Sequence, residues 1–354
     1  MKLSKIKTVL KYQKNTLPIL HEGVQINKNT LAFSNLQTYV YIENYDEPGR
    51  TYGIDKSLYR TGEVEGDYLD FPNKYDKGNE VFSFELDDTF KGNVKKLIPF
   101  LSKDELRPVM CGIFLDKESV TGTDAHVLGT FEHDFSLPSD FECIIPKEFC
   151  EFVEFADTLK IFEAKNGNST QTVLQLSLVS EGKKLIIESR TIDGNYPRFR
   201  GVIPSIYDYN QCVELLANDL KEIDTLVKRK ISGTPSITLG DKIELFEIDY
   251  KSSKKVGEYN KGVIKKECFV QEVILMPTKT IEGKFTINPN LLKNICKGAS
   301  KVSIYFNEIN KACFLDIEYK KVVAKKKRTV AELEIIISNL EQQNDTLVKL
   351  LEAK

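Results

Sequence analysis

The sequence predicts an α+β protein of three successive units with antiparallel sheets, followed by a separate C-terminal helix. Three observations support this fold class: segments in which apolar and polar residues alternate, amphipathic helical stretches between them, and one strand–helix–strand pattern that occurs twice. A chain of 354 residues, 41% of them hydrophobic, is too long for one ordinary core and suits two or three domains.

The first unit, residues 1–80, is the shortest. It is expected to form one helix and three strands, over Ser4–Tyr12, Val24–Ile26, Leu31–Phe33 and Tyr39–Glu43. Only Thr51–Ile54 and a polar, acidic stretch separate these elements from the second unit. We therefore expect the first unit to lack most of a second half, including a second helix.

The second and third units, residues 81–204 and 205–324, each contain a longer amphipathic helix near their start. The helical period of apolar residues predicts these helices over Asp87–Ser102 and Tyr209–Ile231. Alternating segments predict antiparallel strands with one wetted face over Thr172–Leu178, Lys184–Ser189, Ser236–Asp249 and Glu267–Met276.

An internal repeat relates these two units at a constant offset of 143 residues, the difference between positions 289 and 146. Each copy reads as a strand, a proline at the first helical turn, a short amphipathic helix and a second strand. The corresponding positions are Ile144, Pro146, Phe149, Phe152, Ala156, Leu159, Ile161 and Phe162, and then Ile287, Pro289, Leu292, Ile295, Ala299, Val302, Ile304 and Tyr305. One supersecondary unit has therefore been used at least twice.

The segment 325–354 is predicted to be a basic linker and an amphipathic, zipper-like helix. The basic run KKKR leads into a stretch without Gly or Pro, in which seam residues are spaced alternately three and four apart. The seam consists of Val330, Leu333, Ile337, Leu340, Asn344, Leu347 and Leu351. This pattern favours a parallel two-stranded coiled coil with a register set by the asparagine. A terminal helix packed on its own body is the alternative, because Ile336 and Leu350 widen the apolar face.

The overall charge and the cysteines exclude several classes of protein. Fifty basic and 52 acidic residues give a net charge of −2, so any contact with nucleic acid must come from a local arrangement. The seven cysteines are widely spread without a C-x-x-C pair, which argues against a disulfide framework and a zinc site. We expect reduced, mostly buried thiols. With no apolar signal core and no run near the roughly 18 apolar residues of a membrane span, we expect a cytoplasmic protein without membrane contact.

Two motifs in the second unit are the most informative part of the chain: VTGTDAHVLGT at 120–130 and TIDGNYPRFRGVIP at 191–204. In each, small or turn-forming residues interrupt a strand-like run, which is where a fold often presents itself to a partner. Their order and wording resemble the middle domain of the bacterial sliding clamp, the beta subunit of DNA polymerase III. That family carries "ATDGHRLA" and later "DGxFPDYxxVIP" around a pocket that docks peptides.

Other segments extend the resemblance over nearly all of residues 1–324. In the second unit, LSKDELRPVMCGIFLD at 101–116 and CIIPKEFCEFVEF at 143–155 are similar to clamp segments in the family's order. In the third unit FTINPNLLKNI resembles "FNxxYLxDxL", and the first unit offers NTLPILHEGVQI and DFPN. The resemblance implies three domains, each with antiparallel sheets outside and two helices inside, in a homo-oligomeric ring around duplex DNA.

The chain also departs from the family pattern. The glycine of "TDGH" is Ala125, the arginine that follows the histidine is Val127, and the arginine before the "VIP" valine is Gly201. We expect a docking pocket that is kept but altered in charge. In the bacterial family domain 1 meets domain 3 of the other subunit, so the short first domain bears directly on ring closure. It suggests a divergent clamp, as from a virus or mobile element.

The resemblance implies which residues form the peptide pocket. Carried over position by position, they are Met110, Thr123, Ala125, Val127, Leu128, Tyr196, Pro197 and Val202, with His126 on the rim. An extended peptide with apolar anchors needs such a concave apolar floor and a few orienting polar groups. From the residues alone, His126 reads as a histidine with local hydrogen bonds.

The resemblance also implies a sequence-independent contact with DNA phosphates from helices that line the ring. The basic residues on or next to the predicted helices are Lys5, Lys7, Lys11, Lys91, Lys95, Lys96, Arg107, Lys221, Lys228, Arg229, Lys293 and Lys297. Acidic residues after Pro146, at 148, 151 and 154, weaken this field. For any single lysine, a solvated surface position is the alternative.

No enzyme motif is found, so we expect no catalysis and no cofactor. The chain has no Gly-rich phosphate loop, no G-x-S-x-G and no H-E-x-x-H. Asp87 and Asp88 are better explained as charges at a helix N-terminus, and Asp124, His126 and His133 fit no metal ligand set. The leading hypothesis is a polymerase processivity clamp that docks a polymerase and a clamp loader through short peptides. The alternative is a clamp-derived scaffold that dimerises through 330–351 and does not encircle DNA.

Overall fold

The computed structural model describes residues 24–44 and 75–319, except for short gaps at 28–29, 76, 167–168, 181, 231–233, 241, 250–251, 267, 269–271, 282–283 and 308–311. The chain divides into two compact units, Met1–Ile317 and Glu318–Lys354, and the description concerns the first. The helix predicted over Ser4–Tyr12, the basic residues on it and the zipper seam all lie outside the described residues. The division into three domains therefore stays a prediction.

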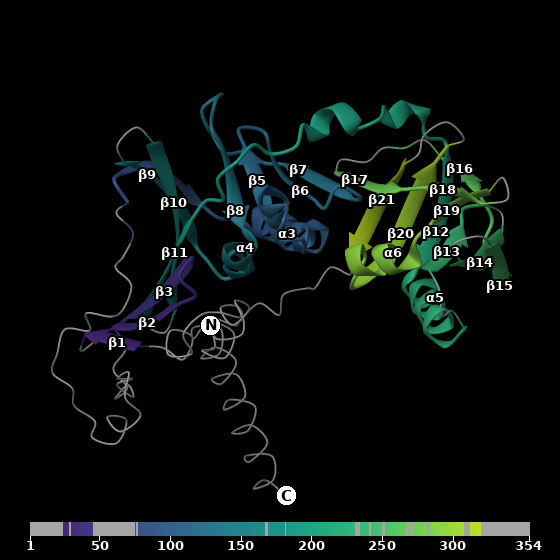
Figure 1. The fold of residues 1–354 in the computed structure, drawn as a ribbon, viewed down its shortest axis with the longest axis horizontal. Helices are drawn as coiled ribbons and strands as arrows, with labels where there is room; N and C mark the ends of the chain where they lie inside the picture. Colours follow the sequence, from purple (N-terminus) through teal and green to yellow (C-terminus); the bar gives the residue numbers. More distant parts are fainter. Residues whose placement is uncertain are drawn as a thin grey trace, which may run out of the picture. The chain divides into compact units, whose positions relative to one another are not determined.

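The described residues form three sheets in which every pairing is antiparallel (Figure 1). The seven-stranded sheet has the order β1-β2-β3-β11-β10-β9-β4. Its strands are β1 Val24–Asn27, β2 Thr30–Ser34, β3 Thr38–Glu43, β4 Asn79–Glu85, β9 Thr158–Asn166, β10 Ser169–Ser180 and β11 Lys183–Arg190. The early strand β3 and the late strand β11 pair over six residues, from Thr38 opposite Ser189 to Glu43 opposite Lys184.

The second sheet has nine strands in the order β16-β12-β20-β21-β17-β7-β6-β5-β8. Its strands are β5 Gly112–Asp116, β6 Ser119–Thr123, β7 Leu128–Glu132, β8 Glu142–Pro146, β12 Gln211–Leu216, β16 Ile264–Lys265, β17 Val273–Pro277, β20 Ala299–Phe306 and β21 Ala312–Tyr319. The third sheet, β15-β14-β13-β19-β18, contains β13 Thr234–Thr238, β14 Lys242–Asp249, β15 Ser252–Asn260, β18 Lys279–Ile281 and β19 Lys284–Ile287. The fold is α+β with antiparallel sheets, as the sequence predicts.

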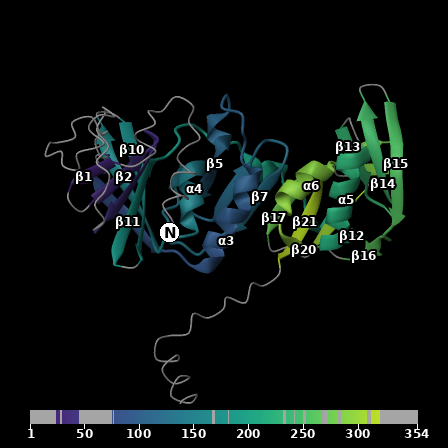
Figure 2. The same cartoon turned by 90° about the horizontal axis from the view of Figure 1, so that it is seen from below.

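Four α-helices are described: α3 Asp88–Leu97, α4 Lys147–Val153, α5 Ala217–Lys230 and α6 Pro289–Ile295. Helix α3 packs with α4, and α5 packs with α6 (Figure 2). The carboxylate of Asp87 caps α3 by accepting a 2.7 Å hydrogen bond from the backbone N–H of Phe90, and Asp88 lies in the first turn. Both carboxylates therefore act at the positive end of a helix, as expected.

The repeat predicted at the offset of 143 residues is confirmed as strand–helix–strand in both copies. The first is β8-α4-β9 and the second is β19-α6-β20. The matched apolar side chains are buried in both copies except Phe162, which is half-buried; Phe149 and Phe152 are fully covered in one helix, and Leu292 and Ile295 are covered in the other. The repeated sequence pattern therefore corresponds to the side of this supersecondary unit that faces the core in both copies.

Four predicted elements differ from the structure in their bounds. The helix expected over Tyr209–Ile231 begins only at Ala217, because Gln211–Leu216 is strand β12 and Leu216 is 53% exposed instead of buried. The helix expected over Asp87–Ser102 ends at Leu97 and continues as a 3₁₀ turn that contains Pro99. The strand expected over Ser236–Asp249 is the hairpin β13–β14, and the described strand that overlaps Glu267–Met276 is β17, which begins at Val273.

All seven cysteines lie within the described residues. All seven cysteines are free thiols, six of them buried and Cys111 half-buried. Burial raises the pKa of Cys143 to about 12, so this thiol stays protonated at neutral pH. Among the described residues, no helix is long and apolar enough to cross a membrane. The same part of the chain contains no cluster of His, Cys, Asp and Glu that could hold a metal ion.

Candidate functional site

The motif VTGTDAHVLGT forms the hairpin β6–β7, whose turn is held by the side chains on either side of it. The carboxylate of Asp124 accepts hydrogen bonds of 2.8 Å from the backbone N–H groups of His126 and Val127. The hydroxyl of Thr123 donates to the carbonyl of Val127 at 2.6 Å and accepts from the N–H of Ala125 at 3.1 Å. Ala125 adopts a φ of +72°, in the left-handed region that favours glycine. The turn therefore has a left-handed backbone at position 125, although the residue there is an alanine.

The two glycines of this motif contact the protein's own core. Gly122 and Gly129 lie opposite each other across β6 and β7. A Cβ on Gly129 would lie 2.8 Å from Leu97 Cδ2, and one on Gly122 would lie 3.3 Å from the carbonyl oxygen of Leu97. The glycines therefore let α3 approach the sheet closely. The interpretation that small residues here face a partner is wrong for these two positions.

The motif TIDGNYPRFRGVIP lies across strands β5 and β6. The ring of Tyr196 stacks on Phe114 with centroids 4.7 Å apart, and its hydroxyl donates to the carbonyl of Thr121 at 3.4 Å. Burial raises the pKa of Tyr196 well above its ordinary value, which keeps this hydroxyl a hydrogen-bond donor. Gly194 has a φ of +129° at a point where a Cβ would lie 2.7 Å from Val109 Cγ1. These contacts fix the motif on the sheet.

An ion pair anchors the same motif at its C-terminal side. The guanidinium of Arg200 lies 2.7 Å from the nearly buried carboxylate of Asp116, at the end of β5. Burial alone would raise the pKa of Asp116. The hydrogen bonds from Arg200 and from the backbone N–H groups of Glu118 and Ser119 outweigh it and hold the pKa below its ordinary value. The carboxylate is therefore charged at neutral pH and holds the 3₁₀ turn Phe199–Val202.

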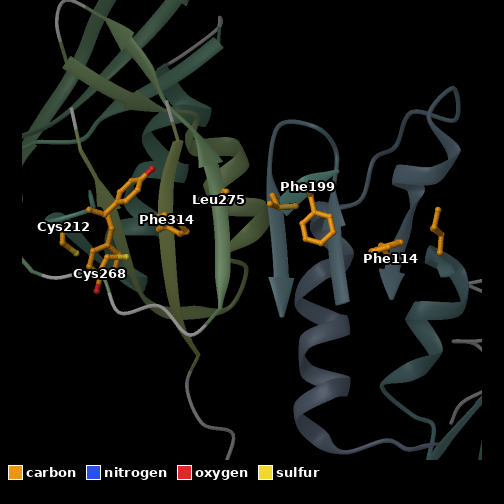
Figure 3. Close-up of a cluster of buried hydrophobic side chains, with 10 residues drawn as sticks. Phe114, Phe199, Cys212, Cys268, Leu275 and Phe314 are labelled. Carbon is orange, nitrogen blue, oxygen red and sulfur yellow. The ribbon is translucent and has the colours of Figure 1, made fainter. Parts of the chain in front are cut away.

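An apolar cluster includes Phe199 of this motif and has members on both sides of the paired strands β7 and β17; Figure 3 shows its labelled side chains. On one side it contains Phe114, Leu128 and Phe199, and on the other Leu275 and Phe314. Half-buried residues pack against its edge: Val109, Ile192, Tyr196, Ile203, Ile206 and Val273. We call this set, with the turn 123–127, the junction surface.

The structure brings some of the predicted pocket residues together and leaves others apart from the apolar cluster. Leu128 is a buried member of the cluster and Tyr196 packs on it. Thr123, Ala125 and His126 form the neighbouring turn, in which the last two are exposed. The other four predicted residues differ in burial. Met110 is half-buried in the 3₁₀ turn Pro108–Cys111, and Val127 is 2% exposed. Pro197 is exposed, and Val202 is 67% exposed.

Sequence reasoning missed the contribution of β17. Leu275 of β17 lies opposite Leu128 of β7, and Val273 lies opposite Thr130. The alternation in Glu267–Met276 indicated a strand, but its pairing with β7 joins positions far apart in the sequence and leaves no local signal. Strand β17 therefore adds two apolar side chains to the junction surface.

The described basic residues proposed to face DNA lie on or beside α3, α5 and α6, except Arg107, which precedes the 3₁₀ turn Pro108–Cys111, and acidic neighbours engage several of them. Lys95 pairs with Glu154 at 3.0 Å, and Lys96 pairs with Glu272 at 3.0 Å. Asp224 of α5 holds both Lys228 and Lys293, at 3.0 and 2.5 Å, and Arg107 pairs with Asp104 at 3.5 Å. The side chain of Arg229 lies outside the described part of the chain. Within the described residues, Lys91, Lys221 and Lys297 form no ion pair, so they carry the least neutralised charge on these helices.

No protein-family model and no curated protein matches the chain. Solved structures do match it. The crystal structure of the DNA polymerase III beta subunit of Thermotoga maritima is similar over 90% of this chain and 97% of that chain, with a TM-score of 0.56 and 14% identity. The fold is that of a bacterial sliding clamp. The Pseudomonas aeruginosa sliding clamp bound to griselimycin gives a TM-score of 0.57 at 13% identity, with 90% of this chain and 96% of that chain covered.

A third clamp, from Bacillus subtilis, matches over 90% of this chain and 98% of that chain, with a TM-score of 0.53 and 12% identity. The match therefore covers almost the whole length of these clamps, although few residues are identical. The resemblance read from the motifs at 120–130 and 191–204 is confirmed at the level of the fold. The clamp fold, and not a sequence signature elsewhere in the chain, is the basis for a functional proposal.

Proposed function

We propose that this protein is a DNA sliding clamp, a non-enzymatic processivity factor that encircles duplex DNA and docks a polymerase. The observation that carries the proposal is the clamp fold over 90% of the chain. Such a factor must hold DNA without reading its sequence, which requires phosphate-directed contacts that tolerate movement along the duplex. Its homo-oligomeric ring, its cytoplasmic location and its dependence on a clamp loader belong to the proposal.

The DNA contact is proposed to come from helices α3, α5 and α6. Lys91 and Lys221 lie on the first two helices, Lys297 follows the third, and none of the three forms an ion pair among the described residues. Lys95, Lys96, Lys228 and Lys293 are held by carboxylates, and these lysines would have to exchange that partner for a phosphate. The basic contact is therefore expected to be weak and dependent on salt.

The partner contact is proposed to be the junction surface, which would accept the apolar anchors of an extended peptide. Clamps from Pseudomonas aeruginosa and Bartonella birtlesii have been crystallised bound to griselimycin, and that compound supplies a probe. Tyr196, which packs on the apolar cluster, and Val202, which is 67% exposed, are two predicted contacts that lie on the motif itself. Their replacement by Ala and Asp should weaken binding of labelled griselimycin, while the charge reversal Lys254→Glu on β15 should not.

The central test is topological retention on DNA. The full chain is incubated with nicked circular plasmid, separated from free protein by gel filtration, and followed after the plasmid is linearised. Retention on the circle and release from linear ends support an encircling clamp. Equal binding to circular and linear DNA, or none to either, contradicts the proposal.

Two variants of matched charge test the helices in the same assay. The variant Lys91→Glu, Lys221→Glu and Lys297→Glu should lose retention, and the slope of log affinity against log salt should fall by about 1 for each phosphate contact removed. The control variant reverses three exposed lysines away from the helices, Lys103, Lys254 and Lys279. Equal loss in both variants would show that only net charge matters.

The mass of the full chain and of residues 1–324 by light scattering separates the clamp from the alternative scaffold. A clamp keeps its oligomeric state without residues 325–354, because the ring is closed by its domains. A scaffold that dimerises through the zipper seam becomes monomeric. Light scattering gives the oligomeric state without DNA, so either result is independent of DNA binding.

A further inference from the structure

Two sets of four strands in this protein have the same arrangement. In the seven-stranded sheet the order is β4-β9-β10-β11, and in the nine-stranded sheet it is β12-β20-β21-β17. The first strand of each set precedes the longer helix, α3 or α5, and the second follows the repeated short helix, α4 or α6. In each set the fourth strand also pairs with a strand outside the set: β11 pairs with β3, and β17 pairs with β7. Strand β17 is therefore the spatial equivalent of β11.

The two equivalent strands come from different places in the chain. Strand β11 returns directly from β10 through the turn at Gly182, so that Ser180 lies opposite Lys183. Strand β17, Val273–Pro277, instead precedes β21, Ala312–Tyr319, and reaches its place before the repeated helix begins. In the second set, the position of the hairpin return is thus filled by an internal strand.

The contacts of β17 show that it holds this position on both sides. Leu275 lies opposite Phe314 of β21 and opposite Leu128 of β7. The thiol of Cys313 lies 3.5 Å from the carbonyl oxygen of Met276. One residue before the strand, Glu272 pairs with Lys96 of α3 at 3.0 Å. Strand β17 is therefore the strand that connects the two halves of the nine-stranded sheet.

The outward side of β17 continues the junction surface. Leu275 is a buried member of the apolar cluster, and Val273 is half-buried at its edge, as are Ile203 and Ile206. A half-buried valine at the edge of an apolar cluster leaves surface that an apolar anchor of an extended peptide would cover. Burial of one such side chain contributes free energy in proportion to the apolar area removed from water.

We infer that β17, rather than the segment that follows β21, forms the third-unit wall of the junction surface, with Val273 as a specificity-determining residue for an extended peptide with apolar anchors. The docking part of this inference rests on the proposed function. The placement of β17 does not.

The first experiment measures amide hydrogen exchange of the full chain, read by mass spectrometry of peptides that cover 272–278 and 320–324. Slow exchange in β17, comparable with that of β11, is the expected result. Fast exchange in β17 with slow exchange in 320–324 would show that the hairpin return occupies the position, and this overturns the inference whatever the binding data show.

The second experiment compares binding of labelled griselimycin to full-length variants that carry the same change in the two candidate strands. Val273→Asp should lower the affinity at least tenfold, Val273→Ile should stay within threefold of the wild type, and Val322→Asp should have no effect. Exchange data on each variant show whether β17 is still paired. The opposite pattern, with loss only for Val322→Asp, overturns the inference. If the wild type binds no griselimycin, the proposed docking function and the role of Val273 both fail, while the exchange data still decide the placement of β17.

Discussion

The alanine in the β6–β7 turn provides a quantitative test of how this hairpin is built. Ala125 holds a φ of +72° and its side chain is exposed, so replacing it with glycine removes almost no packing. A left-handed conformation costs a residue with a Cβ about 1–2 kcal/mol. Glycine gains more freedom in the unfolded chain, which offsets about 0.4–1 kcal/mol. The variant Ala125→Gly should therefore be more stable by about 0.7 kcal/mol.

The assay is equilibrium unfolding in urea followed by circular dichroism at neutral pH. With a urea slope of about 3 kcal/mol/M for a protein of this size, the midpoint should rise by about 0.2 M. The slope itself should not change, because the turn exposes the same surface in both proteins.

A reciprocal control uses a glycine of the same conformation. Gly182, in the β10–β11 turn, has a φ of +75° and open space where a Cβ would be. Gly182→Ala should lower the midpoint by a similar amount, because it adds the same conformational cost without a clash. A lower midpoint for Ala125→Gly, or shifts of the same sign in both variants, would refute the reasoning.

Two further predictions follow from the same region. Asp116→Asn should reduce stability at pH 7, because the lowered pKa of this carboxyl means that its charged form stabilises the folded state. The difference in urea midpoint between the variant and the wild type should shrink as the pH falls from about 4 through the folded pKa of Asp116. A difference that stays constant with pH would contradict this reasoning. Gly129→Ala should lower the free energy of unfolding by about 1–3 kcal/mol, because the added Cβ would lie 2.8 Å from Leu97 Cδ2. Thermal unfolding should show no comparable loss of stability for Gly201→Ala, where an added Cβ meets open space.

The parts of the fold that the sequence predicts well are those fixed by local patterns. The proline and the three-residue spacing around Phe149 and Leu292 define a short helix between strands, and both copies form it. The alternation in Thr172–Leu178 and Lys184–Ser189 likewise corresponds to β10 and β11. In each case the residues that define the pattern also form the core, so the local period and the tertiary contacts agree.

The parts that the sequence does not predict depend on partners distant in the chain. Val213, Leu216 and Leu220 satisfy a helical period, yet the first two belong to β12, which pairs with β20 about ninety positions later. The pairing of Leu275 with Leu128 is also invisible to any local pattern. The glycines 122 and 129 carry a clear signal, but the sequence does not say whether a partner or an internal helix approaches them.

The pocket prediction shows the same division. Thr123, Ala125 and His126 form a turn that the motif itself specifies, through hydrogen bonds between neighbours in the chain. Whether Val127 or Val202 offers surface to a ligand depends on what packs over each, and they are 2% and 67% exposed. Residue type alone could not separate them, because both are valines next to a turn.

The pairing of β3 with β11 has a consequence for the chain during its synthesis. Thr38 and Ser189, whose hydroxyls lie 3.4 Å apart, are separated by 151 residues. At about 5–20 residues per second, a ribosome needs roughly 8–30 s to make the partner strand after β3 has emerged. Strands β2 and β3 are almost entirely buried in the finished protein, so during that interval they present apolar side chains and an open strand edge to the cell. The nascent chain is therefore a natural client for chaperones until its first half can be completed by its second.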